Sequence, residues 1–227
     1  MSTTQLSEIT TAEMTYLSTA QLEGLSTTQW GLLSTDQLVA LTTAQVAGIA
    51  SDDLQGLTSA QISLGIGSDI SAFGTTQVSL LTTAQAAGLS TLQATSLGTA
   101  QIAAITSNDA AVLATVVLSA LTSSQIGTFS SAAIAALTTA QVVSGLGTDL
   151  VGFGTAQIVS LLTTQVSFLT TAQVSVLTTQ QLFAFESQDA QALTTADVLA
   201  LTSVQLAGFS TASIAALTTS QLVNGFG

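Results

Sequence analysis

The chain has 227 residues, of which 47% are hydrophobic, and its mean hydropathy is +0.65. It contains no lysine, arginine, histidine, cysteine or proline, so its twelve carboxylates give a formal net charge of −12. Without cations to neutralise phosphates, direct binding of nucleic acid is excluded. Without imidazole or thiol, zinc sites and the usual activated nucleophiles are excluded, so we expect no enzyme.

The chain opens with MSTTQLSEIT, which lacks the basic and apolar regions of a classical signal peptide. The longest apolar stretch, residues 110–121, is shorter than the roughly 20 residues that cross a bilayer, and it contains Thr115 and Ser119. We therefore expect no transmembrane segment and interpret this stretch as part of a buried core.

An eight-residue repeat runs through the whole sequence. Written in rows of eight from Met1, the chain fills 28 rows without insertion or deletion and leaves three residues. Position 1 is almost always Leu, Ile or Phe; position 3 is Ser or Thr except at Gly67, Gly147 and Gly227; position 6 is apolar. Position 5 is mostly Gln, with Asp as its usual substitute. We call this unit, L-[ST]-T-A-Q-[VIL]-x-x, the octad.

The octad predicts a short helix. Position 6 and the next position 1 are three residues apart, which places them on one face of a helix but on opposite faces of a strand. A Ser or Thr followed three residues later by Gln, as at Thr170 and Gln173, is the capping box that begins a helix. One unbroken helix would turn by about 800° per octad, so its apolar stripe would spiral around the rod. We predict one helix of about five to seven residues per octad, stabilised by stacking in a solenoid.

Two longer periods are superimposed on the octads. GIGSDISAFGTTQ from Gly65 recurs 80 residues later as GLGTDLVGFGTAQ from Gly145, and GFG from Gly225 begins a third copy. We expect these glycines to remove a buried leucine and a cap, and so to tighten a bend or thin the wall. We predict octads 1–32 as an atypical N-terminal capping region and 33–227 as a solenoid with super-repeats 65–144 and 145–224.

Four aspartates are spaced 40 residues, or five octads, apart: Asp69, Asp109, Asp149 and Asp189. From this spacing we predict about five octads per coil, with the four aspartates in a column along one side. Calcium accepts oxygen ligands, so this column is the one candidate metal site. No segment has the spacing of an EF-hand, and an Asp near a helix start is favoured by the helix dipole alone. We expect no cofactor, with calcium as the alternative.

The phrase LTTAQVxxLTTAQ resembles octapeptide tandem-repeat regions of large bacterial secreted and surface proteins of the adhesin-like kind. The resemblance implies a location outside the cell or on its surface. We expect an extracellular structural repeat protein that associates head to tail with copies of itself into a filament, stalk or matrix. Two alternatives remain open: an adhesin segment that binds a glycan or calcium, and an amyloid-like or ice-binding β-solenoid, favoured by Thr, Val and Ile content and low charge.

Overall fold

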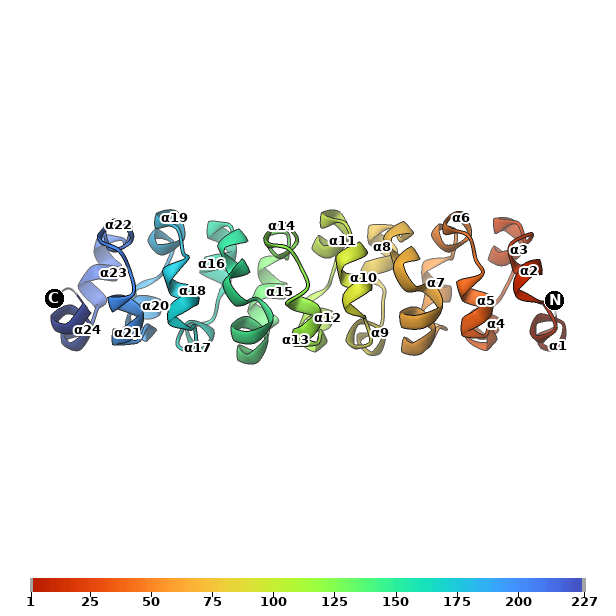
Figure 1. The fold of residues 1–227 in the computed structure, drawn as a ribbon, viewed down its shortest axis with the longest axis horizontal. Helices are drawn as coiled ribbons and strands as arrows, with labels where there is room; N and C mark the ends of the chain where they lie inside the picture. Colours follow the sequence, from red (N-terminus) through yellow and green to blue (C-terminus); the bar gives the residue numbers. More distant parts are fainter. Residues whose placement is uncertain (1, 226–227) are drawn as a thin grey trace.

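The protein is a rod of short helices stacked along one axis. A computed structural model describes residues 2–225, and in this range every octad contributes one helical element and no strand is present. The two ends of the chain lie at opposite ends of the rod (Figure 1). The prediction of an all-α solenoid with one helix per octad is confirmed, and the alternative of a β-solenoid is wrong for the described residues.

The elements of the N-terminal half are α1 (Thr3–Ser7), α2 (Thr11–Met14), α3 (Thr19–Glu23), α4 (Thr27–Leu32), α5 (Thr35–Val39), α6 (Thr43–Ala47), α7 (Ser51–Leu54), η1 (Gln61–Ile66), η2 (Gly67–Ala72), α8 (Thr75–Ser79), α9 (Thr83–Ala87), α10 (Thr91–Ser96), α11 (Thr99–Ala103) and α12 (Ser107–Val112). Those of the C-terminal half are α13 (Thr115–Leu118), α14 (Ser123–Ile126), α15 (Ser131–Ala136), η3 (Gln141–Gly145), η4 (Gly147–Gly152), α16 (Thr155–Ser160), α17 (Thr163–Val166), α18 (Thr171–Ser175), α19 (Thr179–Phe183), α20 (Ser187–Ala192), α21 (Thr195–Leu199), α22 (Ser203–Leu206), α23 (Thr211–Ala216) and α24 (Thr219–Gly225). The η1 and η3 elements are π-helical, and η2 and η4 are 3₁₀-helical.

The capping box at position 2 begins most helices, as predicted. In α6 the cap Thr42 has an extended backbone, and its hydroxyl accepts the Gln45 N–H at 3.3 Å. The Gln45 Oε1 atom accepts the Thr42 N–H in return at 2.7 Å. Because an extended residue cannot continue the preceding helix, each cap both starts its own helix and ends the one before it.

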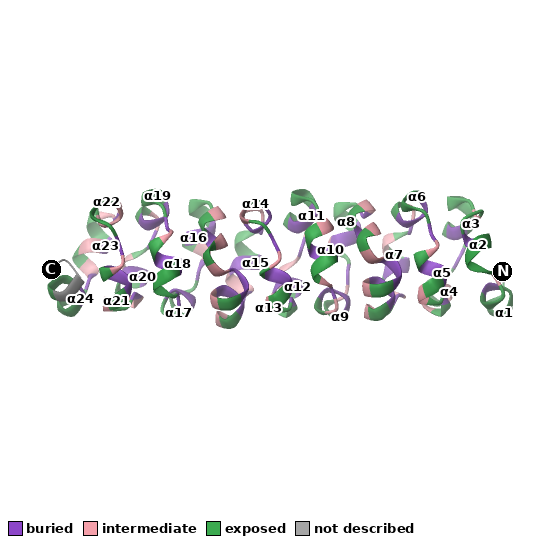
Figure 2. Cartoon of the chain, in the orientation of Figure 1, coloured by how far each residue is buried: buried purple, intermediate pink, exposed green. Residues whose placement is uncertain are grey.

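One continuous hydrophobic core runs along the inside of the rod (Figure 2). Positions 1 and 6 of the octad supply it, as predicted, and Leu41 and Val46 are 4% and 0% exposed. Position 5 is also buried, as at Gln45, which the helical period alone did not predict. The remaining positions face outward or lie at the edge of the core. None of the helices in the described range is long and apolar enough to cross a membrane.

Successive coils stack at an interval of a little more than three octads. Each helix packs against the helix three octads further along, for example α2 on α5, α12 on α15 and α20 on α23. Bonds between coils join residues 25 to 31 positions apart, for example Ser59 to Ala84 and Gln45 to Met14. The prediction of about five octads per coil is therefore wrong. The 80-residue period corresponds to about three turns and the 40-residue period to about one and a half, because a sequence period need not equal one turn.

The two Gly-x-Gly segments are where one helix runs into the next without a cap. Neither η2 nor η4 has a side-chain cap, as predicted. Gly65 has no room for a side chain, because a Cβ atom there would lie 2.8 Å from the Leu38 Cβ. Gly67 has a φ of +52°, which suits glycine. The core is not thinned, because Ile66 fills it with 2% exposure, so that expectation is wrong. The third copy extends into residues 226–227, outside the described range.

Candidate functional site

The most repeated polar arrangement is a glutamine that joins two coils. The Gln45 Oε1 atom accepts both the backbone N–H and the hydroxyl of its own cap, Thr42, at 2.7 and 3.0 Å. Its Nε2 atom donates to the carbonyl oxygens of Met14 and Leu17 in the preceding coil, at 2.8 and 2.7 Å. The buried amide therefore satisfies its donors and its acceptor at once. We call this arrangement a glutamine rung.

Glutamine rungs recur along the rod with a constant spacing. The Nε2 atom reaches carbonyl oxygens 31 and 28 residues back, at position 6 of one octad and position 1 of the next. Rungs with at least one such bond are formed by Gln37, Gln45, Gln61, Gln77, Gln85, Gln93, Gln101, Gln125, Gln141, Gln157, Gln165, Gln173, Gln181, Gln205 and Gln221. Because each bond contributes about 1 kcal/mol net, the rungs tie neighbouring coils together along most of the rod.

Aspartates at position 5 make a different connection between coils. Their shorter side chains accept a Ser or Thr hydroxyl from position 3 of an octad 26 residues back. These aspartate rungs join Thr27 to Asp53, Thr43 to Asp69, Ser123 to Asp149, Thr163 to Asp189 and Thr171 to Asp197, with oxygen–oxygen distances of 2.5 to 3.2 Å. Burial raises the pKa of Asp189, and the Thr163 hydroxyl opposes that rise.

The four aspartates considered for calcium do not come together. Because 40 residues correspond to about one and a half turns, neighbours in the series lie on opposite sides of the rod. Asp69, Asp149 and Asp189 each accept a hydroxyl from the preceding coil. Asp109 accepts the Thr106 hydroxyl at 2.6 Å, and its other oxygen is buried without a partner. Among the described residues, no group of three or more acidic side chains is arranged to hold a metal ion.

Reasoning from the sequence missed the contact that glutamine makes between coils. The capping box already explained a Gln at position 5, so nothing prompted a search for a second role. One signal was present in the residue choice. Glu closes a capping box as well as Gln does, yet Glu occupies position 5 only once, at Glu13, against eighteen glutamines and six aspartates.

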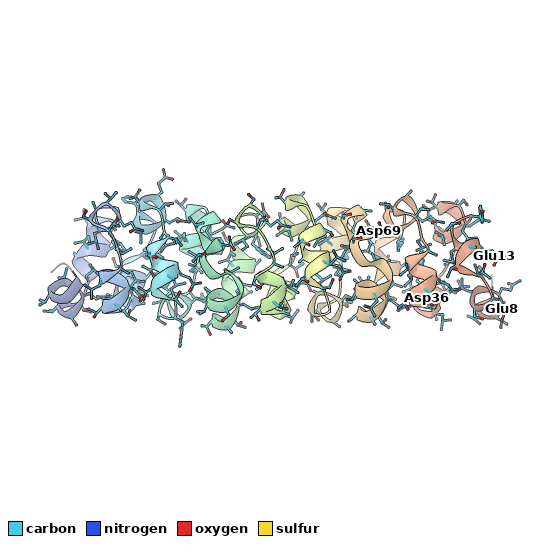
Figure 3. All side chains as sticks on the ribbon, viewed as in Figure 1. Glu8, Glu13, Asp36 and Asp69 are labelled. Atoms are coloured by element: carbon cyan, nitrogen blue, oxygen red, sulfur yellow. The ribbon has the colours of Figure 1, made fainter. Side chains whose placement is uncertain are left out.

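The two end coils of the described chain expose complementary surfaces. Inside the rod, position 1 of one coil packs on position 6 of the preceding coil, as Gly65 does on Leu38. At the N-terminal end the position-1 residues Ile9 and Leu17 are only partly buried. We call the surface formed by Gln5, Glu8, Ile9, Glu13, Tyr16, Leu17 and Gln21 the N-terminal face; it surrounds an open hollow. Its acidic residues Glu8 and Glu13 lie at that end of the rod (Figure 3).

At the opposite end, position-6 residues are the ones left partly uncovered. Leu206 and Ile214 are partly buried, and Leu222 is 40% exposed. Leu206 and Ile214 line a second open hollow together with Phe209. We call this surface, on α22 to α24, the C-terminal face. A coil added to it would cover these side chains as each coil inside the rod covers the one before it.

Comparison with known proteins gives one partial match. A family model described as the ALTTAQ repeat matches residues 6–43 and 147–179. No curated protein and no solved structure matches the chain. In these two segments the chain is therefore similar to a repeat family whose six-letter phrase begins at position 8 and ends at position 5 of the octad.

Proposed function

We propose that this chain is an extracellular structural repeat protein, a stiff rod that assembles end to end into a filament, stalk or matrix. The observation that carries the proposal is the glutamine rung, because it repeats one contact between coils along the rod with full hydrogen bonding. Such a contact can be extended by any further coil that offers the same octads.

The chemistry of the surface supports a structural role. The chain has no cation, so its carboxylates repel one another and limit lateral aggregation of rods. Exposed large apolar side chains such as Leu64 and Phe168 are separated along the rod, whereas the partly covered core residues gather at the two ends. Association of the N-terminal face with the C-terminal face of a second copy would bury the latter.

Electron microscopy and analytical ultracentrifugation of the purified chain test the assembly. We expect rods that lengthen with concentration at some pH between about 4 and 7. Leu206→Glu on the C-terminal face should leave single-unit rods. Leu64→Glu, which places the same charge at a side chain that is 68% exposed, should behave as the wild type. Rods of one unit length at every concentration and pH would overturn the proposal of end-to-end assembly.

The location outside the cell needs a separate test. Antibodies raised against the purified chain should label intact cells of its source, or the material around them. Labelling that appears only after the cells are permeabilised would overturn this part of the proposal while leaving the assembly untouched.

A further inference from the structure

Glu13 occupies the place of a rung residue on the N-terminal face. Its Oε2 atom accepts the backbone N–H and the hydroxyl of Thr10, both at 2.8 Å, so it closes the same capping box as the glutamines. Its side chain is exposed, because no coil lies in front of α2 within the described residues. The remaining oxygen, Oε1, corresponds to the Nε2 atom that interior glutamines use to reach the preceding coil.

A coil stacked in front of α2 would bring carbonyl oxygens to that atom. In the register that continues the octads from one copy to the next, Glu13 corresponds to a residue 31 positions after Leu206 and 28 after Phe209. Interior rungs join residues with these separations. In the described residues, neither of these two carbonyl groups accepts a side-chain hydrogen bond. An ionised Glu13 has no hydrogen to donate, so its oxygen would face two carbonyl oxygens without compensation.

The residue choice along the chain agrees with this conflict. Where a preceding coil is present, position 5 is never Glu. Aspartate is tolerated there because its shorter side chain accepts a hydroxyl 26 residues back, as Asp197 does from Thr171, and does not extend to the carbonyl pair. Glutamate has the length of glutamine but lacks its donor. Its one occurrence at position 5 is on a coil that nothing covers in the described structure.

No other charged group offsets the charge of Glu13. On the N-terminal face the other titratable side chains are Glu8 and Tyr16, and α5, which packs against α2, contributes Asp36. Glu23, on α3, is also acidic. Near the C-terminal face of a second copy the charged groups are Glu186, Asp189 and Asp197, which are acidic as well. The chain has no Lys, Arg or His, so a second copy cannot supply a cation.

We propose that the N-terminal face is the docking surface for the C-terminal face of a second copy, and that docking is blocked while Glu13 is ionised and permitted when it is protonated. This inference rests on the end-to-end assembly proposed above. A protonated Glu13 carries one hydrogen, which its Oε1 atom donates to a carbonyl oxygen of the stacked coil. It then replaces one of the two bonds that a glutamine makes.

The direction of the pH dependence follows from the two environments of the carboxyl group. On the uncovered face, the bonds from Thr10 lower the pKa of Glu13, so it is ionised at neutral pH. Stacking would remove water and bring two carbonyl oxygens, and both changes raise the pKa of the carboxyl group. Stacking therefore takes up a proton, and by linkage it strengthens as the pH falls.

The test compares the wild type with Glu13→Gln and Glu23→Gln by sedimentation velocity across pH. Both variants remove one negative charge from the first coil, but only residue 13 faces the junction. Glu13→Gln preserves the capping box, since Gln21 closes the same box with Ser18, and thermal unfolding checks that the variant is folded. We expect wild-type association to strengthen at least about tenfold between pH 7 and pH 4. Glu13→Gln should associate at neutral pH as strongly as the wild type does in acid, and Glu23→Gln should follow the wild type.

The outcomes separate the gate from the assembly. If the wild type and Glu13→Gln associate with the same constant at neutral pH, the role of Glu13 is overturned and the assembly stands. If Glu23→Gln shows the same gain as Glu13→Gln, net charge is responsible and the gate is again overturned. If none of the three associates at any pH while all are folded, end-to-end assembly fails and the gate with it.

Discussion

Gln21 in the first coil and Gln85 in an interior coil occupy the same octad position but have different surroundings. Both close a capping box with the cap of their own helix. Gln21 is exposed, whereas Gln85 is 1% exposed and donates to the Leu54 and Leu57 carbonyl oxygens, both at 2.6 Å. The local role of the residue is therefore identical in the two coils. The contact between coils is what separates them, and it restricts which residue can stand at this position.

The largest effect should come from exchanging the donor for a charge in the interior. Gln85→Glu keeps the capping box but places a carboxylate against two carbonyl oxygens, which should lower the free energy of unfolding by about 3 kcal/mol or more. Gln21→Glu, the same exchange in the first coil, should change it by less than about 0.5 kcal/mol. Denaturant unfolding measures both. Equal costs at the two positions would show that the rung contributes nothing beyond the cap.

The close approach between coils gives the next effect. A Cβ atom on Gly152 would lie 2.1 Å from the Ser123 carbonyl oxygen, a backbone atom of the preceding coil. Gly152→Ala should therefore cost about 3 kcal/mol, because two coils must move apart. Gly154→Ala is the matched control, since its Cβ would meet only the Gln157 side chain of the same octad, at 3.8 Å. If both variants unfold at the same denaturant concentration, the coils do not pack as described.

Removal of a cap should give a smaller effect that is similar in both coils. Thr82→Ala in front of α9 and Ser18→Ala in front of α3 each remove a hydroxyl that accepts a backbone N–H. Because this bond lies within one octad, each change should cost about 1 kcal/mol. Thermal or denaturant unfolding of the two variants makes the comparison. A large cost at one site and none at the other would contradict the separation of local and tertiary roles.

The smallest effect concerns the aspartate rung of α20. Burial raises the pKa of Asp189 above its ordinary value. Its contribution to stability is therefore greatest below the ordinary aspartate range and is lost as the pH rises through the raised pKa. Asp189→Asn, which can still accept the Thr163 hydroxyl, should gain melting temperature relative to the wild type as the pH rises toward neutrality. A difference between the two proteins that does not vary with pH would contradict this assignment.

The local structure could be predicted from the sequence, because all the information for it lies within one octad. Ser or Thr at position 2 and Gln at position 5 specify a cap, and the apolar positions 1 and 6 specify the buried face. The number of octads per coil could not be predicted in the same way. Asp69 and Asp109 are 40 residues apart because the sequence repeats over a half-integral number of turns, and this period was interpreted as one turn.

The second role of glutamine was hidden because its first role was sufficient. Gln45 is explained by Thr42 alone until Met14 and Leu17 of the preceding coil are in place. Such partners lie 28 and 31 residues away, beyond what a capping motif specifies. The near absence of Glu from position 5 was the available evidence, since it distinguishes two residues that a cap treats alike.

Disulfide formation between designed cysteines tests the stacking interval most directly, since the chain has no cysteine of its own. A Cβ atom on Gly48 would lie 3.5 Å from the Thr19 Cβ in the preceding coil, which is within the range of a disulfide. The double variant Thr19→Cys with Gly48→Cys should oxidise to an intramolecular disulfide, detected by peptide mapping. Thr19→Cys with Ser59→Cys, a pair separated by five octads, should remain reduced. Efficient oxidation of the second pair and none of the first would contradict coils of slightly more than three octads.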